Sequence, residues 1–252
     1  MTRSIRLRRA ARTTRAAPAT ALAPIEGRNG AGQRNLSEAV ADAIVNAIAL
    51  GELAPGQRMV ENEIARKLAI SRVPIREAIR ILQAQGIVQV APNRGARIAS
   101  FDTVEIDQVF EARIALERIA ARGAAAAYRR EPRAIDRLDE IVVRMERAKH
   151  WADWAELRRC DVNFHHEMCR ASGNEIVLKL WEALSRHITI IFGREIASER
   201  DFDVVIAEHQ KLARRLAAGD GALDRELAAH ILRLREPRKR APQPAGKRPR
   251  RP

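Results

Sequence analysis

Aromatic residues, cysteines and long apolar runs are all scarce in this sequence. Only 4% of its 252 residues are aromatic, so a core must consist mainly of Ala, Leu, Ile and Val, which suits packed helices. The two cysteines, Cys160 and Cys169, form no disulfide framework and favour a reducing compartment. The lack of an apolar run of about 18 residues excludes a helical membrane span. The basic N-terminus also lacks the apolar segment of a secretory signal, so we expect a cytoplasmic protein.

Acidic residues are scarce at both ends of the chain. Residues 1–34 hold eight Arg and one Glu, and residues 235–252 hold eight Lys or Arg and one Glu, so the net charge of +14 lies in these ends. Such composition is typical of disordered segments, and we expect disordered basic tails over 1–34 and 236–252. Two interpretations of their charge stay open, namely solvated ends or non-specific attraction to a phosphate backbone.

Residues 35–100 combine three helical patterns with a short hairpin pattern. The apolar periodicity predicts three helices, over 36–48, 60–70 and 71–85. A turn-rich connector separates the first two, and two short strands around a Pro-Asn-Arg-Gly turn follow the third. This order is that of a winged helix-turn-helix, whose third helix enters the major groove of DNA with its N-terminus first.

The start of the third helix and the tip of the hairpin carry the candidate DNA contacts. Arg72 and Arg76 lie at the entry end of the helix, where an Arg can read guanine with two hydrogen bonds or hold a phosphate. Gly95 permits close approach of the backbone to DNA. An isolated helix Arg is usually solvated, but the concentration of such residues at both contact edges favours DNA binding. The candidates are Ser71, Arg72, Arg76, Asn93, Arg94 and Gly95.

Residues 102–234 show helical periodicity throughout, which predicts an all-α bundle of about six helices. Four polar residues fall on faces of these helices that should be buried. They are Asp161, His165, His209 and His230. A single His in such a place is usually a hydrogen-bonded core residue, but three His and one Asp in one bundle favour a divalent cation. The reason is that burying these groups unpaired is costly.

The segment around His165 excludes one common metal motif. His166 and Glu167 begin like the zinc-protease motif H-E-x-x-H, but four residues after His166 the chain has Arg170, which is not a zinc ligand. Asp161 and His165 are spaced i,i+4 and share a helix face, whereas Glu167 lies off that face and is expected to be solvated. Because no general base is evident beside the four candidate ligands, a metal-dependent hydrolase is kept only as an alternative.

Several short pieces occur in one order within residues 36–100, among them P-G-Q-R, S-R-x-P-x-R-E-A and N-R-G-A. They make this region resemble the N-terminal reader domain of the GntR superfamily of bacterial transcription regulators. The resemblance implies that Arg72 and Arg76 contact operator bases. It implies backbone contacts near Ser71, Val73 and Pro74, and wing contacts by Arg94 and Gly95.

The second half of the chain carries the pieces D-x-x-F-H and A-S-G-N and a final His. It resembles the metal-containing branch of the FadR-type ligand-binding domain, the FCD domain, found in VanR-like GntR regulators. The implied metal ligands are Asp161, His165, His209 and His230, with zinc, nickel or manganese as the divalent ion. Arg113 is implied to meet the carboxylate of a small organic-acid effector, or else to form an internal ion pair with Glu117.

These observations predict a mainly α protein with a winged helix-turn-helix over 35–100 and an all-α metal- and effector-binding domain over 101–235. The expected function is that of a homodimeric, non-enzymatic transcription regulator that binds double-stranded operator DNA, most commonly as a repressor relieved by its effector. A metal-free acyl-CoA sensor of the same family is a further alternative, against which the Asp and three His argue.

Overall fold

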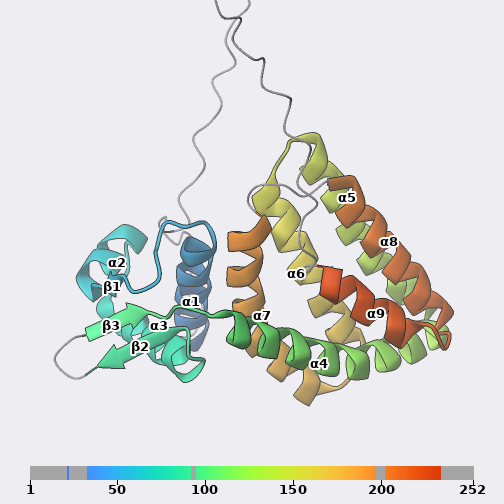
Figure 1. Cartoon of the computed structure of the whole chain (residues 1–252), viewed down its shortest axis with the longest axis horizontal. Helices are drawn as coiled ribbons and strands as arrows, with labels where there is room; N and C mark the ends of the chain where they lie inside the picture. Colours follow the sequence, from blue (N-terminus) through green and yellow to red (C-terminus); the bar gives the residue numbers. More distant parts are fainter. Residues whose placement is uncertain (1–21, 23–32, 92–94, 197–201, 234–252) are drawn as a thin grey trace, which may run out of the picture.

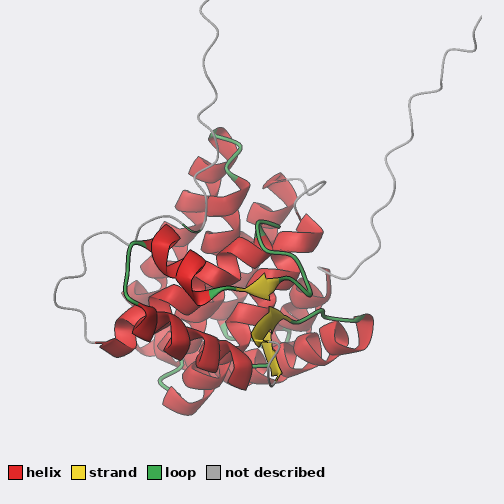
Figure 2. Cartoon of the chain, turned by 90° about the vertical axis from the view of Figure 1, so that its left-hand side faces the viewer, coloured by secondary structure: helices red, strands yellow, loops and turns green. Residues whose placement is uncertain are grey.

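The computed structural model describes residues 22, 33–91, 95–196 and 202–233. The fold is mainly α-helical with one small sheet, as the sequence predicted (Figures 1 and 2). The residues of the two predicted basic tails lie almost entirely outside the described residues, and so do the wing-tip residues Asn93 and Arg94. None of the described helices has the length and apolarity needed to span a bilayer.

The N-terminal domain combines three helices with three short strands. In chain order these are α1 (Gln33–Ala49), β1 (Arg58–Met59), α2 (Glu61–Leu68), α3 (Arg72–Ala84), β2 (Val88–Ala91) and β3 (Gly95–Ile98). Helix α2 ends where Ala69 adopts a left-handed φ of 55°, which reverses the chain direction before α3 begins. The apolar faces of the helices meet in one core, so α2 and α3 form the predicted helix-turn-helix.

The sheet has one strand more than the sequence predicted. Its order is β1-β3-β2, and both pairings are antiparallel. In the short strand β1, Arg58 lies opposite Arg97, and Met59, which is buried, lies opposite Ala96. A strand of two residues is too short to show the alternation by which strands are recognised in a sequence, so this segment was expected to be a loop.

The C-terminal domain is a helical bundle. Its elements are α4 (Thr103–Arg130), a 3-10 turn (Pro132–Ile135), α5 (Asp136–His150), α6 (Trp154–Ala171), α7 (Glu175–Ile196), α8 (Phe202–Ala218) and α9 (Leu223–Leu232). The long helix α4 starts at a capping box, in which Asp102 accepts from the amide of Glu105 and the Glu105 side chain accepts from the amide of Asp102. These six described helices match the predicted number, and their apolar faces form a separate core.

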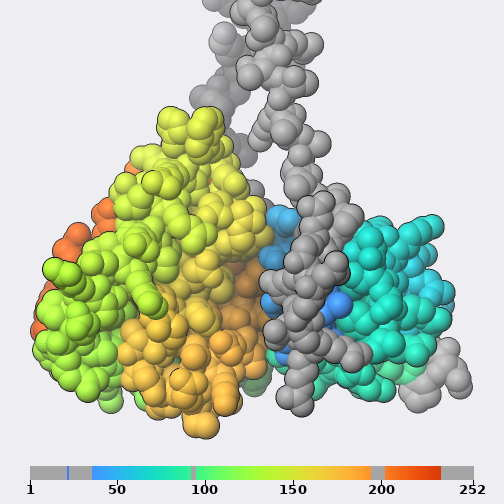
Figure 3. Space-filling view, turned by 180° about the vertical axis from the view of Figure 1, so that it is seen from behind, coloured from blue at the N-terminus to red at the C-terminus, as the bar shows by residue number. Residues whose placement is uncertain are grey.

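Helix α7 lies at the junction of the two domains. It packs against α1 of the N-terminal domain and against α4 and α6 of the bundle, and Figure 1 shows it between α1 and α6. The approach to α1 is close, because a Cβ added to Gly193 would collide with the carbonyl oxygen of Ala49. Seen from behind, the two domains form neighbouring lobes (Figure 3).

Candidate metal centre and nucleic-acid interface

The bundle brings together the four polar side chains that the sequence placed on buried faces. Asp161 and His165 lie one turn apart on α6, while His209 comes from α8 and His230 from α9. One ligand atom of each side chain lies within 4.8 Å of the corresponding atoms of the other three, and all four residues are buried. The same helix faces that pack into the apolar core therefore also bring these four polar groups together.

A buried carboxylate fixes the orientation of His165. The His165 Nδ1 lies 2.7 Å from Glu117 Oε2, and Glu117 also accepts hydrogen bonds from Trp181 Nε1 at 2.8 Å and Arg113 Nε at 2.7 Å. An imidazole that donates its Nδ1 proton to a carboxylate presents a lone pair at Nε2. This Nε2 faces His230 Nε2 at 3.1 Å, so the cluster interior contains nitrogen atoms suited to hold a cation.

His209 and Asp161 form a second pair of facing acceptors. His209 Nδ1 lies 2.8 Å from the carbonyl oxygen of Val205, to which it donates, so its Nε2 carries the lone pair. That Nε2 lies 3.1 Å from Asp161 Oδ1, within ion-pair distance, but the geometry makes no hydrogen bond. Within the described part of the chain, His209 Nε2 and Asp161 Oδ2 are buried without a hydrogen-bond partner. A cation between these atoms would satisfy both.

Burial and neighbouring charges set the protonation states that a metal site needs. Burial lowers the pKa of His165 and lowers that of His230 well below its usual value, so both rings are neutral and able to act as ligands at neutral pH. Burial alone would raise the pKa of Asp161, but His209, His165 and Arg113 bring it down to about 2. Three imidazoles and one carboxylate form a donor set suited to zinc, and to nickel or manganese.

Arg113, the candidate effector contact, makes the internal ion pair that was the alternative. Both Arg113 and Glu117 are almost wholly buried, and the pair adjoins the cluster of Asp161 and the three His through His165. One guanidinium nitrogen of Arg113, Nη1, is buried and has no hydrogen-bond partner among the described residues. The ion pair thus leaves one donor for a ligand. Trp181, which holds Glu117 from α7, was not singled out, because nothing in its local sequence marks a partner on another helix.

Four other polar residues of this helical region are located as follows. His166 faces away from the cluster and lies 3.1 Å from Glu182 on α7. Cys160 and Cys169 are buried free thiols, and burial raises the pKa of Cys160 to about 12. Glu167 was expected to be solvated, which is wrong: its side chain is only 12% exposed and accepts from Arg170 Nε at 2.7 Å.

The N-terminal domain presents two of the candidate DNA-reading residues side by side. Arg72 Nη2 and Arg76 Nε both donate to the same oxygen of Glu61, at 3.1 and 2.8 Å. Both arginine side chains are 53% exposed, and the two arginines lower the pKa of Glu61 although burial opposes this. Glu61 lies in the first turn of α2. Its contact with the two arginines could not be predicted from the sequence, because it forms only when α2 and α3 pack together.

The remaining candidate DNA contacts differ in their exposure. Ser71 is exposed and Val73 is 48% exposed, whereas Pro74 is buried in the first turn of α3 and can only position its neighbours. Gly95 begins β3 with a left-handed φ of 73°, which favours glycine. Arg58 lies close to it, since an added Cβ would be 3.5 Å from Arg58 Nε.

Comparison with protein families divides the chain at the same place as the fold. Residues 36–98 match the family described as bacterial regulatory proteins, gntR family, and residues 108–234 match the FCD domain. The chain is 32% identical to the "Probable D-xylose utilization operon transcriptional repressor" of Paenarthrobacter nicotinovorans, over 77% of this chain and 82% of the relative. It is 24% identical to the "Gluconate operon transcriptional repressor" of Bacillus licheniformis, over 68% of this chain and 71% of the relative.

Solved structures show the same arrangement of elements. The chain is similar to McbR/YncC of E. coli, with a TM-score of 0.69 and 21% identity over 79% of this chain and 94% of that one. It is also similar to a putative GntR transcriptional regulator from Rhodococcus sp. RHA1, with a TM-score of 0.63 and 22% identity over 78% of this chain and 94% of that one. At these identities the likeness shows the fold.

Proposed function

The chain belongs to the GntR family of bacterial regulatory proteins and carries an FCD domain, and we propose that it is a homodimeric repressor controlled by a divalent metal ion and a small organic-acid effector. DNA-binding transcriptional regulation is the function of the family. The names of two relatives include the word repressor, which supports the same sign of regulation here. A DNA partner supports a cytoplasmic location.

The observation that carries the metal proposal is the convergence of four potential ligand atoms in the bundle. His165 Nε2 faces His230 Nε2, and His209 Nε2 faces Asp161 Oδ1, each at 3.1 Å. Two lone pairs at that distance repel each other unless a proton or a cation lies between them, and a metal ion would satisfy all four groups together. Zinc matches this donor set best, and nickel and manganese are the other candidates. Glu117 would orient His165 as an outer hydrogen-bond partner.

A carboxylate effector would be held beside the metal. Arg113 Nη1 is a buried donor that lacks a partner among the described residues, and the guanidinium lies next to the cluster through the Arg113–Glu117–His165 series of contacts. One oxygen of the effector would complete the coordination of the metal, and the other would accept from Arg113. The same arrangement argues against a hydrolase, since Glu117 is engaged by three donors and cannot serve as a free base.

The DNA-reading elements suit a two-fold operator. Arg72 and Arg76 would contact base edges in the major groove, Ser71 and Val73 would lie near the backbone, and the wing at Gly95 would follow the neighbouring sugar-phosphate edge. Asn93 and Arg94, which lie outside the described residues, complete the proposed wing. In a homodimer the two recognition helices would enter successive major grooves.

Helix α7 provides a physical connection between the two sites. Trp181 near its start bonds to Glu117 beside the cluster. Farther along the helix, Arg186 donates to Asp42 Oδ1 of α1 at 2.9 Å, and His187 Nε2 lies 2.9 Å from the carbonyl oxygen of Gln85 at the end of α3. An effector that shifts Glu117 would therefore act on a helix that contacts α1 and the end of α3 in the N-terminal domain, the DNA reader.

Two measurements on the purified full-length protein test this proposal. Genomic DNA fragments retained by the protein would identify an operator, and fluorescence anisotropy would then follow operator binding with and without added Zn²⁺ and a panel of small organic acids. We expect one class of acid to release the operator only when metal is present. Failure to retain any specific fragment would overturn DNA regulation, while an effector response unchanged by chelation would remove the metal from the mechanism.

A further inference from the structure

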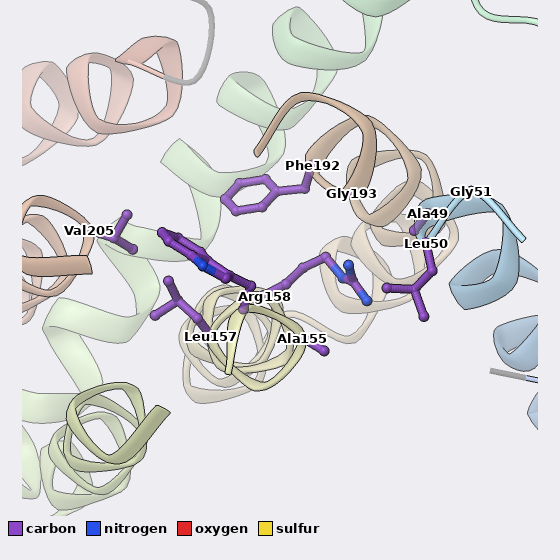
Figure 4. A pocket seen from close by; sticks show the side chains of 10 residues that line it. Ala49, Leu50, Gly51, Ala155, Leu157, Arg158, Phe192, Gly193 and Val205 are labelled. Carbon is purple, nitrogen blue, oxygen red and sulfur yellow. The ribbon is translucent and has the colours of Figure 1, made fainter. Parts of the chain in front are cut away.

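A cavity of about 340 Å³ opens at the junction of the two domains (Figure 4). It is lined by Ala49 at the end of α1 and the following Leu50 and Gly51, by the first turns of α6, and by Phe192 and Gly193 of α7 and Val205 of α8. Most of these residues are apolar, and Trp154 and Phe192 contribute aromatic rings. The volume is sufficient for a small organic molecule.

One charged group stands out in this apolar lining. Arg158 is only 9% exposed, and Figure 4 shows its side chain extending from α6 toward the end of α1. No described residue forms a hydrogen bond or an ion pair with it, and its Nε is buried without a partner. Burial lowers the pKa of Arg158, although an arginine remains cationic at neutral pH.

The acidic residues in the preceding turn of α6 are engaged elsewhere. Asp153 caps the helix by accepting from the amide of Glu156 at 2.9 Å. Its charge attracts Arg158, but the two side chains form no ion pair. Glu156 accepts from Arg144 Nη2 and Arg159 Nε, at 2.7 and 2.8 Å. The carbonyl groups at the C-terminal end of α1 attract a cation weakly, but none of them accepts a hydrogen bond from Arg158. A buried guanidinium in this state is a ready partner for an anion from outside the chain.

We infer that this junction cavity binds a small monocarboxylate with an aromatic or branched apolar body. The carboxylate would pair with the Arg158 guanidinium, and the body would lie against Leu157, Phe192 and Val205. A single cation in an apolar lining favours one negative charge over a phosphate or a dicarboxylate. The site is separate from the metal cluster, and this inference goes beyond the proposed function.

The position of the cavity gives such a ligand access to both domains. The ligand would touch α1 of the reader and three helices of the bundle at once. Two residues that line the cavity also contact or adjoin the metal cluster. Leu157 lies one helical turn before Asp161, and the carbonyl oxygen of Val205 accepts a hydrogen bond from His209. Binding here would therefore fix the reader relative to the bundle.

The first test compares an acid with its neutral analogue. Calorimetric titration of the full-length, Zn²⁺-loaded protein would use 3-phenylpropionate and 3-phenylpropanol, which differ in charge but share the same apolar body. We expect the acid to bind about tenfold to hundredfold more tightly than the alcohol, as a charge-assisted contact implies. Equal affinities, or no binding of the acid, would overturn the inference.

The second test locates the site. Arg158→Gln should remove the advantage of the acid, Arg158→Lys should keep part of it, and Arg159→Gln is the matched control, since Arg159 is exposed and paired with Glu156. Circular dichroism would check that each variant folds. If Arg158→Gln does not fold, an Arg158→Lys variant whose affinity for the acid equals that of the parent would overturn the inference.

A metal-site variant separates this inference from the proposed function. His165→Ala should keep the affinity for 3-phenylpropionate while it loses metal. If His165→Ala loses binding of the acid and Arg158→Gln keeps it, the acid is a ligand of the metal, so the inference fails and the proposed function stands. If both variants behave as expected but no operator can be found, the proposed function fails and the junction site stands.

Discussion

Two Arg–Glu contacts of nearly equal length serve different purposes in the two domains. In the reader, Arg76 Nε lies 2.8 Å from Glu61, and the side chains are 53% and 31% exposed. In the bundle, Arg113 Nε lies 2.7 Å from Glu117, and the side chains are 1% and 0% exposed. Water screens the first pair, so exchange of Glu61 for a DNA phosphate costs little. The second pair has no such screening, and loss of one partner leaves a buried charge uncompensated.

The largest effect is expected from Glu117→Gln. This change leaves Arg113 buried without a counter-charge and removes the carboxylate that orients His165, so the free energy of unfolding should fall by about 3–5 kcal/mol. Glu61→Gln, the matched change in the exposed pair, should lower it by less than about 1 kcal/mol. Urea unfolding followed by circular dichroism measures both. Similar losses in the two variants would show that burial does not distinguish the pairs.

The buried Arg113–Glu117 pair should make the stability of the metal-free protein fall at acid pH. Arg113 and His165 outweigh the effect of burial and lower the pKa of Glu117 from 4.5 to about 2. A carboxyl group whose pKa is lower in the folded state stabilises the fold fully above pH 4.5, and this contribution is lost as the pH falls toward 2. The loss amounts to roughly 3 kcal/mol. Urea midpoints measured across this range should fall more steeply for the parent than for Glu117→Gln, and parallel curves would contradict the assignment.

The proposed metal ligands should be distinguishable from their neighbours within a single segment. His165 lies in the cluster, whereas its neighbour His166 faces Glu182. Zn²⁺ at about one hundred times its Kd should stabilise the parent and His166→Ala by about 2.7 kcal/mol, and His165→Ala or Asp161→Ala by much less. Elemental analysis and urea unfolding would measure this. Equal metal content in His165→Ala and the parent would show that His165 is not a ligand, and a parent without metal would show that the cluster is only a polar core.

The sequence predicted what depends on periodicity and could not predict what depends on contacts between helices. The inward stripes of three helices placed Asp161, His165, His209 and His230 on buried faces, because helical spacing is local information. The bond from Trp181 to Glu117 joins two helices that are distant in the sequence, and no repeat marks it. Strand β1 was missed because it has only two residues, and the burial of Glu167 was missed because Arg170 and Arg137 cover it.

Replacement of the exposed arginines Arg72 and Arg76 should have an effect of intermediate size, measured as a loss of operator affinity. Arg72→Ala and Arg76→Ala should each weaken specific binding by about 1–3 kcal/mol, because each would remove a proposed contact to a base. Arg80→Ala is the matched control on the same helix, since Arg80 is 73% exposed and paired with Glu77. Anisotropy titrations with the operator would measure all three. An effect of Arg80→Ala as large as those of the other two would assign the arginines to general charge rather than to base reading.

The smallest effect is expected from replacement of Glu61, the carboxylate that Arg72 and Arg76 share. In Glu61→Gln the amide oxygen can still accept a hydrogen bond, but the negative charge facing DNA is gone, so affinity for unrelated DNA should rise by up to about fivefold. Operator affinity should rise less, because Arg72 and Arg76 are held less firmly in the orientation that reads bases. Anisotropy with operator and scrambled duplexes measures both, with Glu77→Gln as the control. A drop in operator affinity comparable to that of Arg76→Ala would mean that the exposed pair, like the buried one, is structurally required, and the contrast between the two domains would then fail.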